Sequence, residues 1–214
     1  MTAEEIKQAN EQLNGKTPQE IANWAVEKSD GSILVSTNFR PYEAVILHLC
    51  VQARPDMPVL WMDGGWNRPA TYQHAHEVIE KLNLNVTIYT PKMTHAHWHA
   101  VHGEAVPTPD DDTFQEFSQL TKLEPFQRGM KEMAPKVWIT GLRKVQNPNR
   151  ANLDIVSEDQ HFGTDVKVSP AFNMTDEDME AYLKEFDLPN EWDYFDPVKA
   201  DEKRECGLHA PVNK

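Results

Sequence analysis

One thiol stands apart from the rest of the chain. Cys206 lies in a charged C-terminal stretch, with Lys203 and Arg204 before it and His209 three residues after it. Nearby cations favour the thiolate, the reactive form of cysteine, whereas Glu205 opposes them. Because no hydrophobic core is expected in such a stretch, we interpret Cys206 as a candidate redox nucleophile. The alternative is an exposed cysteine without a function.

The chain holds one other cysteine. Cys50 ends the apolar helical stretch 44–50 and is predicted to be a small buried core residue. Two thiols cannot build a disulfide scaffold, a four-thiolate zinc site or a four-cysteine iron–sulfur cluster. We therefore expect thiol chemistry with no iron–sulfur cluster and no other bound cofactor.

Three polar loops offer a binding site for an anionic nucleotide. Each follows a predicted strand, and the loops together supply helix N-termini, glycines that admit close approach, a carboxylate, an indole and cations. Taken singly, each is more typical of a helix cap or a solvated surface. Together they favour a nucleotide or sulfonucleotide pocket. The candidate substrate-binding residues are Ser36, Thr37, Asn38, Phe39, Asp63, Gly64, Gly65, Trp66, Arg143, Lys144 and Arg150.

Alternating strand and helix patterns must position these loops. Predicted strands cover 33–35, 58–62, 86–89, 137–140 and 166–168, and predicted helices cover 18–28, 41–53, 69–82, 117–130 (interrupted by Pro125) and 175–186. This order predicts an α/β fold: a single open, doubly wound, mostly parallel sheet with helices on both faces. The hydrophobic period ends after Leu188. We therefore expect a nucleotide-binding domain over 1–188 and a mobile C-terminal catalytic tail over 189–214.

Composition excludes several classes of partner. Lys and Arg number 21 against 34 Asp and Glu, a net charge of −13, which argues against nucleic-acid binding. No apolar run is long enough to cross a membrane, and the acidic N-terminus is unlike a secretory signal. The expected location is the cytoplasm.

Four histidines crowd one segment, 95–102. On a strand His95, His97 and His99 would share a face, whereas on a helix His95, His99 and His102 would do so. No cysteine lies nearby to complete a zinc site. We favour a surface or pocket-rim role for these side chains over metal binding.

Several segments resemble the phosphoadenylyl-sulfate (PAPS) and adenylyl-sulfate reductases, within the adenine-nucleotide alpha-hydrolase-like group with its PP-loop. The segment 203–209 is similar to the family's C-terminal catalytic signature, and 36–39 to its modified PP-loop. Further matches are Leu60–Trp66 followed by Pro69 and Thr71-Tyr72, then Lys122-Leu123-Glu124-Pro125, and Gly141–Lys144 with Arg150–Leu153.

The resemblance implies a PAPS reductase of assimilatory sulfate reduction, which serves cysteine biosynthesis. Cys206 would attack the sulfonate sulfur, releasing adenosine 3′,5′-bisphosphate and leaving a cysteine S-sulfonate, from which thioredoxin or glutaredoxin would release sulfite. His209 would contact the sulfonate. Lys122 and the loop residues named above would bind the substrate. A homodimer is also implied.

The departures from the family are as informative as the matches. The cluster-binding cysteines of adenylyl-sulfate reductases are absent, which favours PAPS. Arg40-Pro41 replaces the usual glycine after Phe39, and the stretch between Trp192 and Lys203 is shorter than in typical bacterial members. Two alternatives stay open: a cluster-free adenylyl-sulfate reductase, and a non-catalytic nucleotide-binding or regulatory relative.

Overall fold

A six-stranded sheet forms the centre of the computed structural model, which describes residues 1–150 and 153–198. The strand order is β3-β2-β1-β4-β6-β5, and every neighbouring pair is parallel except β5 with β6. This confirms the predicted open, mostly parallel sheet. The strands are β1 (Ile33–Thr37), β2 (Pro58–Met62), β3 (Asn85–Tyr89), β4 (Val137–Ile139), β5 (Val156–Ser157) and β6 (Val166–Val168).

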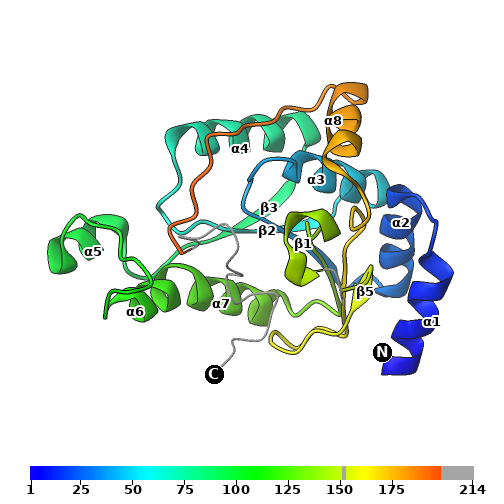
Figure 1. Ribbon diagram of the computed structural model, residues 1–214, viewed down its shortest axis with the longest axis horizontal. Helices are drawn as coiled ribbons and strands as arrows, with labels where there is room; N and C mark the ends of the chain where they lie inside the picture. The colour runs from blue at the N-terminus through cyan, green and yellow to red at the C-terminus, as the bar shows by residue number, and fades with distance from the viewer. Residues whose placement is uncertain (151–152, 199–214) are drawn as a thin grey trace.

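Helices connect the strands and cover both faces of the sheet. Figure 1 shows α3 and α4 on one side of the sheet and α7 on the other. The helices are α1 (Ala3–Leu13), α2 (Pro18–Lys28), α3 (Glu43–Ala53), α4 (Pro69–Leu82), α5 (His95–His102), α6 (Phe114–Ser118), α7 (Glu124–Met133) and α8 (Asp176–Glu185), with a π-helical turn η1 (Gln119–Leu123) and the 3₁₀ turns η2 (Lys144–Gln146) and η3 (Pro148–Arg150). No helix in these described ranges has the length and apolar character needed to cross a membrane.

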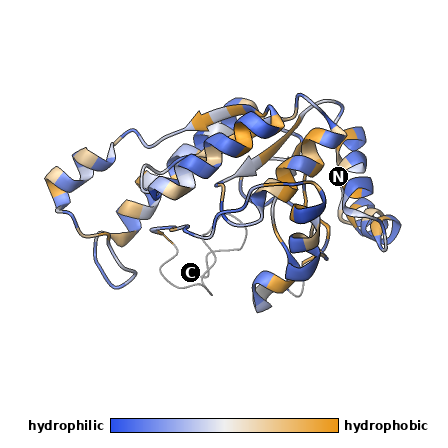
Figure 2. Cartoon of the chain, turned by 90° about the horizontal axis from the view of Figure 1, so that it is seen from above, coloured by the Kyte–Doolittle hydropathy of each residue, from blue (hydrophilic) through white to orange (hydrophobic). Residues whose placement is uncertain are grey.

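Two apolar layers hold the helices to the sheet. On the α3 side, Ile33 and Val35 of β1 join the larger buried cluster. On the α7 side, Leu34 packs with Phe126 and Trp138. This alternation follows from the two-residue period of a strand, and Figure 2 shows the hydrophobic strands between helices that carry both polar and apolar residues. Both faces of the sheet are therefore buried, as a parallel sheet requires.

Three local features differ from the prediction. The helix expected from Pro41 begins at Glu43, because Phe39 and Tyr42 have positive φ angles of 52° and 72° and turn the chain first. The 117–130 pattern is interrupted slightly earlier than expected, by the π-helical turn η1, and Pro125 itself lies in the first turn of α7, where proline is well tolerated. β5 was not predicted, because a two-residue strand carries no readable period.

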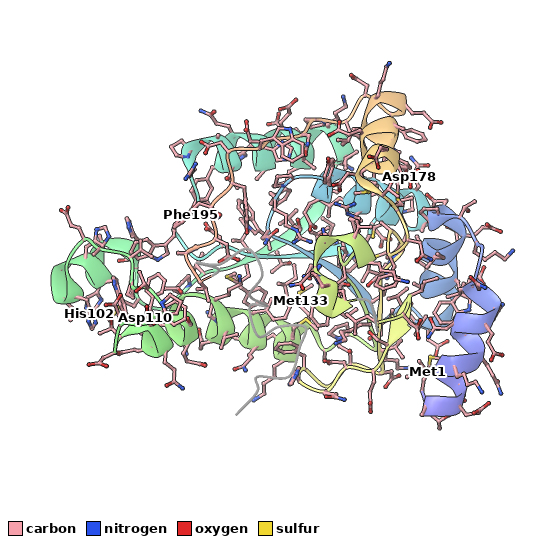
Figure 3. The ribbon with its side chains drawn as sticks, in the orientation of Figure 1. Met1, His102, Asp110, Met133, Asp178 and Phe195 are labelled. Atoms are coloured by element: carbon pink, nitrogen blue, oxygen red, sulfur yellow. The ribbon has the colours of Figure 1, made fainter. Side chains whose placement is uncertain are left out.

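The chain after α8 crosses the sheet edge without forming a helix or strand. Residues 189–198, here called the strap, run back along α4 and then turn toward the sheet (Figure 1). Lys81 near the end of α4 pairs with Asp187 just before the strap, and Arg68 at the start of α4 pairs with Asp193. Figure 3 places Phe195 between α4 and the layer of α6 and α7.

Candidate active site

The carboxyl ends of β1, β2 and β4 meet at one edge of the sheet. The chain builds outward from β1 to β2 and β3, and then returns to place β4 on the other side of β1. In open α/β sheets such a reversal of strand order is where ligands bind. The three polar loops identified in the sequence follow β1, β2 and β4 and therefore all lie at this edge of the sheet.

The loop after β1 is organised by its own side chains. Thr37 Oγ1 accepts a hydrogen bond from the backbone N–H of Phe39 at 3.0 Å, which supports the positive φ angle there. Ser36 Oγ accepts one from Trp138 Nε1 at 2.8 Å. The Phe39 ring is buried edge-on against Trp61, with centroids 4.9 Å apart. The side chain of Phe39 thus lies in the core, and its backbone is the part that faces the loop.

The loop after β2 is tied together by Asp63. Its Oδ1 accepts hydrogen bonds from the Gly65 N–H at 2.9 Å, from Asn67 Nδ2 at 3.1 Å and from the Tyr72 hydroxyl at 2.9 Å. Burial and this last hydrogen bond raise the pKa of Tyr72 to about 12. Asp63 therefore shapes the turn that presents Gly64 and Trp66.

Glycine at position 64 permits a close approach to the π-helical turn η1. A Cβ there would lie 3.1 Å from the carbonyl oxygen of Thr121. This contact brings the loop after β2 beside Lys122, the next residue of the turn. π-helical turns are frequent at functional sites, because they shift side chains out of the regular helical register.

Lys122 is a buried cation at this edge. Its side chain is only 6% exposed, and its Nζ pairs with the carboxylate of Asp196 from the strap, which is itself 11% exposed. On the other side of the strap, Tyr194 accepts a hydrogen bond from Asn38 Nδ2 at 2.7 Å. The strap thus reaches two residues that the sequence singled out for substrate binding.

A small cavity of about 30 Å³ lies under the strap. Four predicted substrate-binding residues line it: Asn38, Gly64, Trp66 and Lys122. The remaining lining comes from the surrounding loops and from the strap, namely Met62, Asn67, Thr121, Tyr194, Phe195, Asp196, Pro197 and Val198. The structure therefore brings together residues from four separate segments of the chain.

The cations of the loop after β4 do not converge on this cavity. Arg143 is buried over the Tyr42 ring, and its guanidinium donates to Asp176 Oδ1 at 2.7 Å and to the Met174 carbonyl at 3.2 Å. Lys144 is exposed and lines a groove beside α1. Arg150 is buried and donates to Gln146. These three side chains remain predicted phosphate contacts, although the described partners of Arg143 and Arg150 are other parts of the chain.

The four histidines lie on a helix, which decides between the two arrangements left open by the sequence. His95 and His99 contact Trp66, with ring centroids 3.9 and 5.1 Å away, and His102 stacks on Trp98 at 4.0 Å. Among the residues that the structure describes, no group of three His, Cys, Asp or Glu side chains could hold a metal ion. His95 and His99 instead border the indole that lines the cavity.

The structure confirms the prediction for one of the two cysteines, Cys50. Cys50 is fully buried, and burial raises the pKa of its thiol. The protonated thiol, which is unreactive, is therefore the favoured form. Cys206 and His209 lie outside the described residues.

Sequence reasoning missed the residues that the strap contributes. Tyr194, Phe195 and Asp196 lie in the predicted mobile tail over 189–214 and are not among the predicted substrate-binding residues. The signal available was a run of aromatic residues, Trp192, Tyr194 and Phe195, in a segment with no helical or strand period. Such a run indicates docking onto the folded domain.

Comparison with known proteins agrees with this geometry. A family model described as the phosphoadenosine phosphosulfate reductase domain matches residues 32–192. The chain belongs to this family. A phosphoadenosine 5′-phosphosulfate reductase from Xanthomonas euvesicatoria pv. vesicatoria is 32% identical, over 98% of this chain and 94% of the relative. One from Synechococcus sp. is 29% identical, over 95% and 97%.

Solved structures give the same result. The crystal structure of a phosphoadenylyl-sulfate reductase from Candida auris, a phosphate complex, superposes with a TM-score of 0.77, 26% identity and 89% coverage of each chain. The NH3-dependent NAD synthetase from Campylobacter jejuni covers 86% of this chain and 74% of its own at a TM-score of 0.53 and 13% identity, a likeness of fold alone.

Proposed function

We propose that this chain reduces PAPS to sulfite and adenosine 3′,5′-bisphosphate, with Cys206 as the nucleophile. Family membership supports the reaction. The observation that carries the proposal for this chain is the position of the strap: Val198 lines the cavity at the strand ends, and Cys206 follows eight residues later. At about 3.3–3.6 Å per extended residue, that tether spans at most roughly 29 Å from the docked strap, and the 18 residues from Leu188 to Cys206 span at most roughly 65 Å once the strap is released. The shortened tail is therefore long enough to deliver the thiol.

The chemistry proceeds in three displacement steps. The Cys206 thiolate attacks the sulfonate sulfur, a sulfur–sulfur bond forms, and the sulfur–oxygen bond to the phosphate breaks, with the electron pair leaving on adenosine 3′,5′-bisphosphate. A thiol of an external dithiol protein then attacks Cys206 sulfur, and sulfite leaves with the bonding pair. The second external thiol resolves the mixed disulfide. The dithiol supplies two electrons and becomes a disulfide, and the sulfonate sulfur accepts them.

The side chains at the sheet edge divide this work. Lys122 supplies a buried positive charge for an anionic group of the nucleotide, because a cation at low exposure acts more strongly than one in water. Trp66 offers an aromatic surface for the base, and Asn38 and Gly64 border the same cavity. His209 is assigned to the sulfonate.

The remaining assignments follow from the same reaction. With one cysteine in the tail, the second thiol must come from a partner, so thioredoxin or glutaredoxin is the proposed reductant, with no cluster or other cofactor bound. Residues 1–188 serve as the nucleotide-binding domain and 189–214 as the catalytic tail. A cytoplasmic homodimer completes the proposal.

Intact-mass measurement tests the central step. Purified, reduced protein is incubated with PAPS or with adenylyl sulfate, and the expected product is a single added sulfonate on Cys206 with PAPS. Thioredoxin should then release sulfite. Equal or faster modification by adenylyl sulfate would assign the chain to the cluster-free alternative. Nucleotide binding without modification by either compound would favour a non-catalytic relative.

A matched pair of variants separates chemistry from binding. Cys206→Ser should abolish the sulfonate adduct and sulfite release while nucleotide affinity stays within about twofold. Cys50→Ser removes the other thiol and should leave the adduct in place. If Cys206→Ser loses nucleotide binding as well, the cysteine is structural.

A further inference from the structure

The ion pair between Lys122 and Asp196 joins the domain to the strap inside the site. Both side chains are nearly excluded from water, and the two residues are 74 positions apart in the chain. A buried pair of this kind forms at the cost of desolvating both charges.

Other contacts hold the strap in register with this pair. The Asp193 carbonyl oxygen accepts a hydrogen bond from Thr71 Oγ1 at 3.1 Å, and Tyr194 accepts one from Asn38. These contacts come from side chains of α4 and of the loop after β1. The strap itself does not pair with any strand of the sheet. Segments attached in this way open at low free-energy cost compared with sheet strands.

The space left under the strap is too small for a nucleotide. A cavity of about 30 Å³ accommodates water molecules, whereas small-molecule sites commonly measure about 300–1,000 Å³. The cavity wall on one side consists of Tyr194, Phe195 and Asp196. Nucleotide and strap cannot occupy the edge together in this arrangement.

We propose that Asp196 takes, at Lys122, the place of an anionic group of the substrate, so that nucleotide binding displaces the strap by exchange of one anion for another. This proposal rests on the function proposed above. The exchange keeps Lys122 paired with a negative charge in both states, which avoids the large cost of an unpaired buried cation. The strap is thus a self-inhibitory contact that opens only when a matching anion arrives.

The exchange also links substrate binding to the thiol. Asp196 precedes Cys206 by ten residues on the same tail. A nucleotide that releases Asp196 from Lys122 therefore also releases the docked part of the tail that carries the nucleophile.

Calorimetric titration with adenosine 3′,5′-bisphosphate tests the exchange, using the full chain. Asp196→Asn removes the competing charge and retains the shape. If the paired arrangement accounts for about nine-tenths of the free protein, apparent binding should tighten about tenfold, because affinity scales with the competent fraction. The matched control is Asp56→Asn, which makes the same charge change in an exposed ion pair with Arg54 and should change affinity less than twofold.

A double-mutant cycle separates this proposal from the underlying site. Lys122→Met should weaken nucleotide binding at least tenfold, and adding Asp196→Asn in that background should have no further effect. If Lys122→Met leaves affinity unchanged, the proposed site is wrong. If Lys122→Met weakens nucleotide binding, the proposed binding site is supported. If Asp196→Asn alone then weakens nucleotide binding or leaves it unchanged, the exchange is refuted. Near-ultraviolet circular dichroism of each variant with saturating nucleotide reports whether it is folded.

Discussion

The guanidinium of Arg40 donates through Nη2 to the carbonyl oxygen of Gly141 at 3.0 Å. This hydrogen bond links the loop after β1 to the loop after β4. Arg40 Nε also donates to Glu43 Oε1 at 2.9 Å, and the Glu43 side chain is 7% exposed. Arg40 therefore forms a cross-link between two site loops that a glycine at this position could not provide.

Removing the cross-link should loosen both loops. We expect Arg40→Ala to lower the free energy of unfolding by about 2–3 kcal/mol, because hydrogen bonds to charged groups contribute roughly that much and a buried carboxylate is left behind. kcat/KM for PAPS should fall with it. Chemical denaturation and steady-state assays measure the two effects. Lys16→Ala, which breaks an exposed ion pair with Glu20, should cost less than about 1 kcal/mol and leave kcat/KM unchanged.

Gly141 should not tolerate a side chain. A Cβ at this position would lie 2.6 Å from Glu43 Oε1, so the carboxylate would have to move away from Arg40. Gly141→Ala is expected to destabilise the fold by about 1–3 kcal/mol, the usual range for overpacking. In a denaturation cycle with Glu43→Ala, the double variant should lose less stability than the sum of the two single variants. Additive losses would mean that the two residues do not meet.

The two thiols should react at very different rates with iodoacetamide. Cys50 is fully buried with a raised pKa, so in native protein at pH 8 the label is expected on Cys206 alone. Peptide mapping by mass spectrometry identifies the site. In guanidinium chloride both residues should be labelled. Native labelling of Cys50 at a comparable rate would contradict the packing of α3.

Stability should fall in mildly acidic solution because of His74. Burial lowers the pKa of His74 below its ordinary 6.5, although Glu77 and Glu191 act in the opposite direction. Below pH 6.5 the unfolded chain therefore binds a proton that the folded chain resists, and acid favours unfolding by at most about 1.4 kcal/mol per pH unit. Above this window the stability is retained.

Denaturation at pH 7.5 and pH 5.5 measures this effect. His74→Met removes one titrating ring and should reduce the difference between the two pH values, while His48 and His95, whose pKa values burial also lowers, account for the part that remains. His76→Met changes an exposed histidine on the same helix and should not reduce the difference. Helix-cap acids do not interfere, because hydrogen bonds from Thr17 lower the pKa of Glu20 to about 2, well below the range tested. An unchanged slope in His74→Met would assign the pH dependence to another group.

Local sequence signals determined most of the architecture. The capping box of Thr17 with Glu20 and the proline after it set the start of α2, and strand residues such as Leu34 alternate with their neighbours between the two apolar layers. These features depend on residues within one or two turns of each other, so they are readable along the chain. The family motifs then predicted that Lys122 and Asn38 belong to one site, and both residues line the same cavity.

Only the tertiary structure determined which partners the charged and polar side chains have. The sequence places Arg143 in a cationic loop, but its guanidinium is directed to Asp176, a residue of α8 that lies 33 positions away. Lys122 meets Asp196, and Asn38 meets Tyr194, across still longer separations. A long side chain can reach in many directions, and its partner is chosen by packing between distant segments. The spacing of residues along the chain does not predict such partners, so the ion pair between Lys122 and Asp196 could be seen only in the folded molecule.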